Sequence, residues 1–245
     1  MNIEFKKEPF EHFIITNVFL PDQKESILSD LDDVRKHVFP SQETKSHSAK
    51  DPKTRNSLRK SQAWFIEEGT PLDKIGGITL DYMKQFLSDG FIKIVDETKD
   101  ISIFKYYILT NYPSYLISYY EDNDNYDTHW DMALITNLTW LNKEPKNFEG
   151  GDLFFDKYNY KIEYESNKTV IFPSVEYHRV GNIKMKNNEV GGGRYCITNF
   201  CSFVPTSNTS GHKMFYTYDV PKRVYAPDRH PVSTKPQKLK DEDEN

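Results

Sequence analysis

Apolar residues recur at helical spacing in two short segments of the first hundred residues. An apolar stretch covers residues 13–20, and the apolar residues of the segment after it follow helical spacing. We expect this helix to begin at Asp22, its predicted N-cap. A second helix is predicted within residues 78–89, where three apolar side chains share one face and Gly90 follows as a stop signal. Between the helices, residues 40–60 are polar and charged, a length typical of a lid over a site or of a disordered segment.

From about residue 101 the pattern changes to short runs rich in aromatic and β-branched residues. Seven such runs follow, separated by turn-forming clusters such as EDNDN, GGD and ESN. Many short strands with this punctuation predict a β sandwich, jelly roll or barrel. We divide the chain into a support region of helices and strands at 1–100, a β core at 101–205 and a C-terminal arm at 206–245, partly disordered, all within one domain.

Composition restricts the class of protein. The 245 residues can bury on the order of 70% of their unfolded surface without a disulfide or metal. A net charge of −5 lacks the basic excess of a general nucleic-acid binder. No apolar run approaches the ~18–20 residues of a membrane span, and residues 1–13 lack the apolar segment of a signal peptide. We therefore expect a cytoplasmic protein without a membrane partner, in which Cys196 and Cys201 are reduced thiols on opposite faces of a strand.

A histidine and a carboxylate two residues apart, His129 and Asp131, follow a strand-like segment. Alternation places both on one face, close enough to share a metal ion. His178 comes after a strongly apolar strand, where a hydrogen-bonded core histidine and a metal ligand are both reasonable interpretations. Two imidazoles and one carboxylate form the facial triad of non-haem Fe(II) oxygenases, although the same donors serve zinc hydrolysis. The other histidines, His12 among them, lack ligand spacing and are interpreted as surface residues.

Arg194 opens an apolar strand sixteen residues after His178. Alternation places Arg194, Cys196 and Thr198 on one face of that strand. A guanidinium is costly to bury unless it meets a carboxylate, which it can bind through two hydrogen bonds. A surface ion pair is the alternative interpretation.

In order and spacing these residues resemble the 2-oxoglutarate- and Fe(II)-dependent dioxygenases, and within them the prolyl 4-hydroxylase-like branch. The resemblance covers roughly residues 115–204, and RKSQAWF at 59–65 adds a weaker similarity. The matching stretches are Tyr120…Tyr126-x-x-His129-x-Asp131, TWLN (139–142), EGGDLFF (149–155), VIFPS…HRV (170–180) and GGRYCITNF (192–200). The resemblance implies a double-stranded β-helix, the cupin-like jelly roll, with flanking helices.

The resemblance also implies roles for individual residues. His129, Asp131 and His178 would bind Fe(II), and Arg194 would bind the C5 carboxylate of 2-oxoglutarate. Thr198 would add a hydroxyl hydrogen bond to that carboxylate, and Tyr120 would close the cosubstrate pocket. The implied reaction uses O₂ and 2-oxoglutarate to hydroxylate a C–H bond, giving succinate and CO₂, with ascorbate as a candidate reductant. The sequence departs from the family at Trp140, where many relatives have an aromatic hydroxyl or threonine, and in the longer segment 184–193.

The substrate stays open at this point. Resemblance favours a prolyl residue in a peptide or protein, with a free amino acid or other small metabolite as the alternative. Relatives that demethylate nucleic acids typically carry a second arginine six residues after the first, where this chain has Phe200. A non-catalytic or zinc-holding jelly-roll binding module is the alternative from another class, and the sequence does not indicate an oligomeric state.

Overall fold

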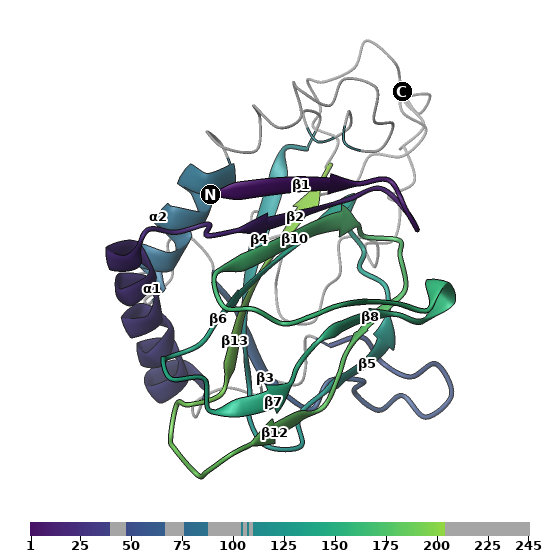
Figure 1. The fold of residues 1–245 in the computed structure, drawn as a ribbon. Helices are drawn as coiled ribbons and strands as arrows, with labels where there is room; N and C mark the ends of the chain where they lie inside the picture. The colour runs from purple at the N-terminus through teal and green to yellow at the C-terminus, as the bar shows by residue number, and fades with distance from the viewer. Residues whose placement is uncertain (40–47, 67–75, 88–103, 105–106, 108–109, 204–245) are drawn as a thin grey trace, which may run out of the picture.

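Two antiparallel sheets face each other in the computed structural model, which describes residues 1–39, 48–66, 76–87, 104, 107 and 110–203 (Figure 1). The larger sheet has seven strands in the order β1-β2-β10-β6-β13-β4-β3, and the smaller one has four in the order β5-β11-β8-β9. A two-stranded ribbon, β12-β7, accompanies them. The expected mainly β, jelly-roll fold with flanking helices is confirmed.

The strands are β1 (Asn2–Lys6), β2 (His12–Thr16), β3 (Gln62–Ile66), β4 (Tyr112–Tyr120), β5 (Tyr126–His129), β6 (Ile135–Leu141), β7 (Phe148–Gly150), β8 (Leu153–Phe155), β9 (Tyr160–Ile162), β10 (Lys168–Pro173), β11 (His178–Val180), β12 (Ile183–Met185) and β13 (Arg194–Ser202). The helices are α1 (Pro21–Asp33), continued by a π-helical turn at Val34–Val38, and α2 (Gly77–Gln85), with a 3₁₀ turn at Asp156–Tyr158.

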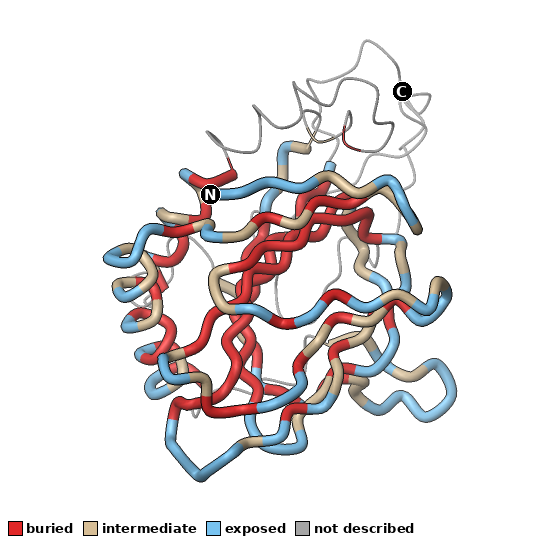
Figure 2. The backbone as a smooth tube through the Cα atoms, in the orientation of Figure 1, coloured by how far each residue is buried: buried red, intermediate tan, exposed pale blue. Residues whose placement is uncertain are grey.

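The large sheet is buried on both faces along its central strands (Figure 2). Alternation along β13 divides its side chains between two apolar clusters: Tyr195, Ile197 and Cys201 pack in the cluster that includes the helices, and Cys196 packs in the cluster between the sheets. Because both faces are buried, the polar side chains of these strands form hydrogen bonds with one another, as between Asn137 and Asn199 and between Thr139 and Thr169. Both cysteines are free and buried, as expected.

The N-cap of the first helix lies two residues earlier than the prediction. Leu20 is the N-cap, its backbone N–H donating to Oε1 of Gln23 at 2.9 Å, and Pro21 occupies the first helical position. The assignment of Asp22 as N-cap was therefore wrong. Proline at the first position has a backbone φ already suited to the helix, and the side-chain oxygen of Gln23 accepts a hydrogen bond from the backbone N–H of the N-cap, as the glutamine of a capping box does.

The support region contributes strands to the large sheet itself. β2 pairs with β10, and β3 pairs with β4 at the other edge. His12 was expected at the surface, but it is fully buried in β2, with its ring nitrogens 2.8 Å from the Phe10 carbonyl and 3.0 Å from the Tyr160 hydroxyl. The His12 side chain points into the protein, where the rings of Phe10 and of Tyr160 in β9 pack against the imidazole.

Some predictions fall on parts of the chain that lie outside the described residues. These are the first part of the polar segment, at 40–47, and the C-terminal arm beyond residue 203. The lid and the disordered arm therefore stay predictions, as do the domain boundaries. Of the helices in the described ranges, none has the length and apolar character needed to cross a lipid bilayer.

Candidate metal centre

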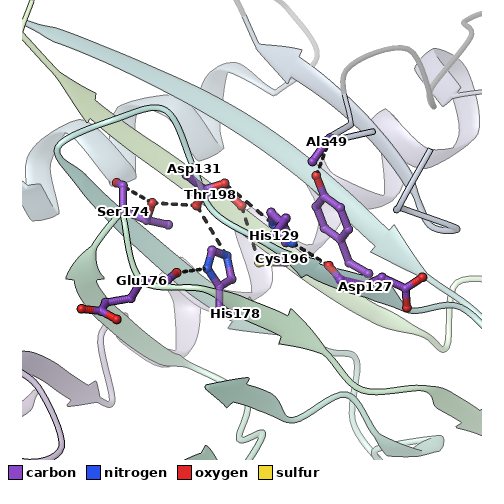
Figure 3. Close-up of polar contacts among 11 residues, drawn as sticks. Ala49, Asp127, His129, Asp131, Ser174, Glu176, His178, Cys196 and Thr198 are labelled. Carbon is purple, nitrogen blue, oxygen red and sulfur yellow. Dashed lines mark hydrogen bonds and ion pairs between the residues drawn. The ribbon is translucent and has the colours of Figure 1, made fainter. Parts of the chain in front are cut away.

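The two histidines of the predicted triad come from neighbouring strands of the small sheet. His129 ends β5, His178 begins β11, and the two residues are direct partners in the antiparallel pairing. Asp131 follows β5 after one residue, and one donor atom from each of the three lies within 4.8 Å of the other two (Figure 3). The Nε2 atoms of His129 and His178 lie 3.8 and 3.5 Å from the two carboxylate oxygens of Asp131. Metal–ligand bonds of about 2 Å require adjacent ligand atoms to lie about 3 Å apart. A small movement of the three side chains toward one another would therefore allow them to bind one ion.

Backbone carbonyls orient both imidazoles. The Nδ1 atom of His129 lies 2.8 Å from the Asp127 carbonyl oxygen, and that of His178 lies 2.9 Å from the Glu176 carbonyl oxygen. A carbonyl oxygen only accepts hydrogen bonds, so each Nδ1 carries the proton and each Nε2 keeps its lone pair. This outer contact is the one that commonly fixes the tautomer of a metal-binding histidine.

The Asp131 carboxylate is also held in place. Its Oδ2 accepts a hydrogen bond of 2.8 Å from the Thr136 hydroxyl, which lies 2.8 Å from the hydroxyl of Ser174. Thr136 and Ser174 are fully buried. Sequence reasoning missed both residues, because a threonine in a strand and a serine in the turn after β10 carry no ligand pattern of their own.

Burial favours the neutral, metal-binding form of the first histidine. It lowers the pKa of His129 well below the ordinary value of a histidine, and the nearby imidazole of His178 lowers it further. The two ring centres lie 4.4 Å apart. The uncharged imidazole of His129 therefore has its Nε2 lone pair available for a divalent cation.

Arg194 is the second feature of the site, and it is fully buried. None of its three guanidinium nitrogens has a hydrogen-bond partner among the described residues. Its Cζ atom lies 4.9 Å from the ring centre of Tyr120, 5.3 Å from that of Trp140 and 5.5 Å from that of Tyr164. Aromatic faces stabilise a cation only partly, and an unpaired buried charge costs several kcal/mol. The arrangement therefore calls for an anion, and the carboxylate of a 2-oxo dicarboxylic acid fits the planar fork.

Gly151 leaves room for the Arg194 side chain. A Cβ atom on Gly151 would lie only 2.9 Å from Arg194 Cδ and 2.6 Å from Ile183 Cδ1, and its φ of +79° disfavours other residues. The glycines of EGGDLFF resemble an ordinary turn in sequence, yet this one is in direct contact with the buried arginine.

The two remaining predicted pocket residues lie on the same inner face of the large sheet. Tyr120 is the direct strand partner of Arg194. Thr198 is buried four residues along β13, its Oγ1 3.9 Å from the Cys196 sulfur (Figure 3). The carboxylate contact assigned to Thr198 and the pocket-closing role of Tyr120 stay predictions.

A second buried guanidinium, Arg59, was absent from the predicted site. Its Cζ lies 4.7 Å from the ring centre of Tyr126, whose ring stacks on His129 at 3.6 Å. Its Nε and Nη1 are buried without a partner in the part of the chain that the structure describes. The polar segment around it is docked on β5, with the Tyr126 hydroxyl 2.8 Å from the Ala49 backbone nitrogen (Figure 3). The RKSQAWF similarity was the available signal, but the surrounding polar sequence favoured a surface loop.

Fold and site together define a jelly roll with a 2-His-1-carboxylate metal triad and a buried arginine. Residues 115–202 match the model of the 2OG-Fe(II) oxygenase superfamily. This matched segment carries the triad and Arg194, and the family is the one that the sequence motifs resemble.

Solved structures with a similar fold are distant in sequence. A prolyl-4-hydroxylase from Pseudomonas putida is 13% identical, with a TM-score of 0.48, and the alignment covers 79% of this chain and 93% of that one. The viral collagen prolyl hydroxylase of Paramecium bursaria Chlorella virus-1, in a 2OG complex, is 13% identical with a TM-score of 0.44, covering 77% and 93%. A full-length protein of Neurospora crassa, in complex with alpha-KG, is 13% identical with a TM-score of 0.43, covering 77% and 73%. A search of curated proteins finds no match.

Proposed function

We propose that this protein is an Fe(II)- and 2-oxoglutarate-dependent dioxygenase that hydroxylates a C–H bond. The observation that carries the proposal is the buried guanidinium of Arg194, whose nitrogens have no hydrogen-bond partner in the described ranges. It packs on Tyr120, which belongs to the same apolar cluster as Tyr126, the residue that stacks on His129. The triad alone would also suit zinc hydrolysis. Hydrolysis has no evident need for a buried cation that binds a carboxylate, and a binding module needs neither feature.

The residues of the site would have two roles: some would bind the metal and 2-oxoglutarate, and others would exclude water. His129, Asp131 and His178 would hold the metal on one side and leave three coordination positions for other ligands. Arg194 would bind the distal carboxylate of 2-oxoglutarate and so orient its 2-oxo acid end toward the metal. When bound, Fe(II) and 2-oxoglutarate supply the reduction of O₂ that accompanies hydroxylation, with succinate and CO₂ as co-products. The apolar walls between the sheets would keep bulk water from the reacting groups.

For the substrate we propose a prolyl residue in a peptide or protein, as the resemblance favours. Three exposed apolar side chains flank the metal ligands in sequence: Trp130, Val175 and Tyr177. Such a rim suits an extended peptide better than a single polar metabolite. We expect no nucleic-acid partner, in view of the net charge of −5 and of Phe200 in β13.

Arg59 supports a second candidate, a free amino acid or other small acid. The charges of a divalent metal, Asp131, Arg194 and the two carboxylates of 2-oxoglutarate sum to zero. Arg59 then leaves one buried positive charge without an acidic partner among the described residues. A substrate carboxylate would neutralise it.

Anaerobic titration of the apo-protein with Fe(II) and then 2-oxoglutarate tests the reaction class. We expect a weak visible charge-transfer band when the 2-oxo acid chelates the metal, and no band in His129→Ala, because that variant lacks one of the three ligands. The measurement is absorbance spectroscopy at each addition. Tight metal binding without a band on adding 2-oxoglutarate would contradict the proposal and favour a zinc site or a binding module.

The Arg59→Gln variant separates the two substrate candidates once the band is established. If the substrate is a free acid, the variant should raise its KM by about 10- to 100-fold, because a charge-assisted hydrogen bond is lost. Hydroxylation of proline-rich peptides and of free amino acids is measured by mass spectrometry for both proteins. Lys60→Gln, which removes an exposed cation next in sequence, is the matched control and should change neither KM. A turnover preference for peptides that survives Arg59→Gln would reject the small-acid candidate.

A further inference from the structure

The indole of Trp140 has a buried N–H group without a partner. Trp140 lies in β6 and is fully buried, and its Nε1 has no hydrogen-bond acceptor among the described residues. Buried tryptophan N–H groups are normally hydrogen-bonded, because leaving one unsatisfied destabilises the folded state. The group therefore needs an acceptor that the described part of the protein does not provide.

Trp140 and Arg194 are diagonal neighbours on the inner face of the large sheet. Trp140 is the direct strand partner of Cys196, which stands two residues after Arg194 on β13. Diagonal positions of adjacent strands lie within reach of long side chains, and the guanidinium carbon is 5.3 Å from the centre of the Trp140 ring. Four buried donor nitrogens that lack partners within the described ranges, three from Arg194 and one from Trp140, therefore lie together.

The neighbouring polar groups do not supply the missing acceptor. The hydroxyl of Tyr164 donates to Asn142 Oδ1 at 2.8 Å, and no hydrogen bond joins its oxygen to the Trp140 Nε1. The Cys196 sulfur contacts the Thr198 hydroxyl, and burial raises the pKa of this thiol, so it stays protonated. Tyr164 also stacks on Trp140, with ring centres 5.7 Å apart and an interplanar angle of 23°, which restricts rotation of the indole. The N–H group cannot easily turn toward another partner.

We propose that the Trp140 indole N–H donates a hydrogen bond to the distal carboxylate of 2-oxoglutarate, beside Arg194. The inference rests on the proposed function. A carboxylate has two oxygens with about four acceptor sites, enough for the guanidinium fork and one further donor. Trp140 is thus a cosubstrate-binding residue that selects 2-oxo acids with a carboxylate at the far end over neutral ones.

Binding measurements on the Mn(II)-loaded full chain test the proposal without requiring turnover. The ligands are 2-oxoglutarate and 2-oxopentanoate, which lacks only the distal carboxylate, and the proteins are wild type and Trp140→Phe. We expect Trp140→Phe to weaken 2-oxoglutarate about 10- to 100-fold, the range for a hydrogen bond to a charged group. Binding of 2-oxopentanoate should change by less than about twofold, since it has no acceptor for the indole. Trp64→Phe, a tryptophan of β3 outside the proposed pocket, is the control for an aromatic exchange.

A second readout follows the indole proton itself. The three tryptophans give three indole N–H resonances, and the resonance missing in Trp140→Phe identifies that of Trp140. In Zn(II)-loaded protein this resonance should move downfield on adding 2-oxoglutarate and stay in place on adding 2-oxopentanoate. An unmoved resonance, or an equal loss of affinity for both acids in Trp140→Phe, would overturn the inference and leave the proposed function standing. Failure of the wild type to bind 2-oxoglutarate would overturn both.

Discussion

His178→Ala is expected to abolish hydroxylation and to weaken metal binding on the order of 100-fold or more, because it leaves only two protein ligands. His178 presents its Nε2 to Asp131, while its Nδ1 donates a hydrogen bond to the Glu176 carbonyl. Metal affinity is measured with Co(II), whose visible spectrum reports the coordination number. Turnover is measured as succinate formation in the presence of substrate.

Stability measurements separate loss of the metal site from loss of the fold. Apo His178→Ala should still unfold cooperatively, at a lower temperature than apo wild type, because the removed imidazole is buried against Phe172 and gives up a hydrogen bond to the backbone. Added metal should raise the melting temperature of wild type and not that of the variant. His37→Ala, which removes a histidine from the π-helical turn after α1, should match wild type in both states. Full activity in His178→Ala would remove this residue from the metal site.

Arg194→Ala is expected to raise the 2-oxoglutarate concentration required for activity on the order of 100-fold or more. Breaking a buried ion pair costs about 3–5 kcal/mol, which corresponds to at least two orders of magnitude in affinity. Metal affinity should be unchanged, because Arg194 provides no metal ligand. The Kd for 2-oxoglutarate is measured by calorimetry on Mn(II)-loaded protein.

The apo-protein provides a separate test of the unpaired charge. Arg194→Ala should leave apo stability unchanged or raise it, because the variant removes a buried cation that has no hydrogen-bond partner in the described structure. Arg179→Ala is the matched control, since its guanidinium forms a half-exposed ion pair with Asp156 at 2.7 Å and should affect neither measurement. An unchanged Kd for 2-oxoglutarate in Arg194→Ala would withdraw the cosubstrate role of this arginine.

The sequence was sufficient for the fold class and for choosing three side chains that the structure brings together. Period-two alternation and turn clusters are local signals, so the change from helical to β patterning near residue 101 is readable without a structure. The same alternation predicts that Arg194 and Cys196 lie on one face of β13, and the structure confirms this prediction. The three triad residues could be picked out because a histidine and an aspartate two residues apart, followed by a second histidine after an apolar strand, form an uncommon pattern.

The tertiary structure decided which buried groups lack partners and which residues meet across strands. Arg59, Gly151 and Trp140 are unremarkable in sequence, because a hydrogen bond that is missing, or a Cβ that does not fit, depends on residues far away in the chain. His12 was misassigned for the same reason, since Tyr160, 148 residues away in the chain, packs on its imidazole. Local pattern determines which face of a strand a residue occupies. Long-range strand pairing alone determines what lies opposite that residue, and here it brought together the guanidinium of Arg194 and the indole of Trp140, whose four nitrogens have no partner among the described residues.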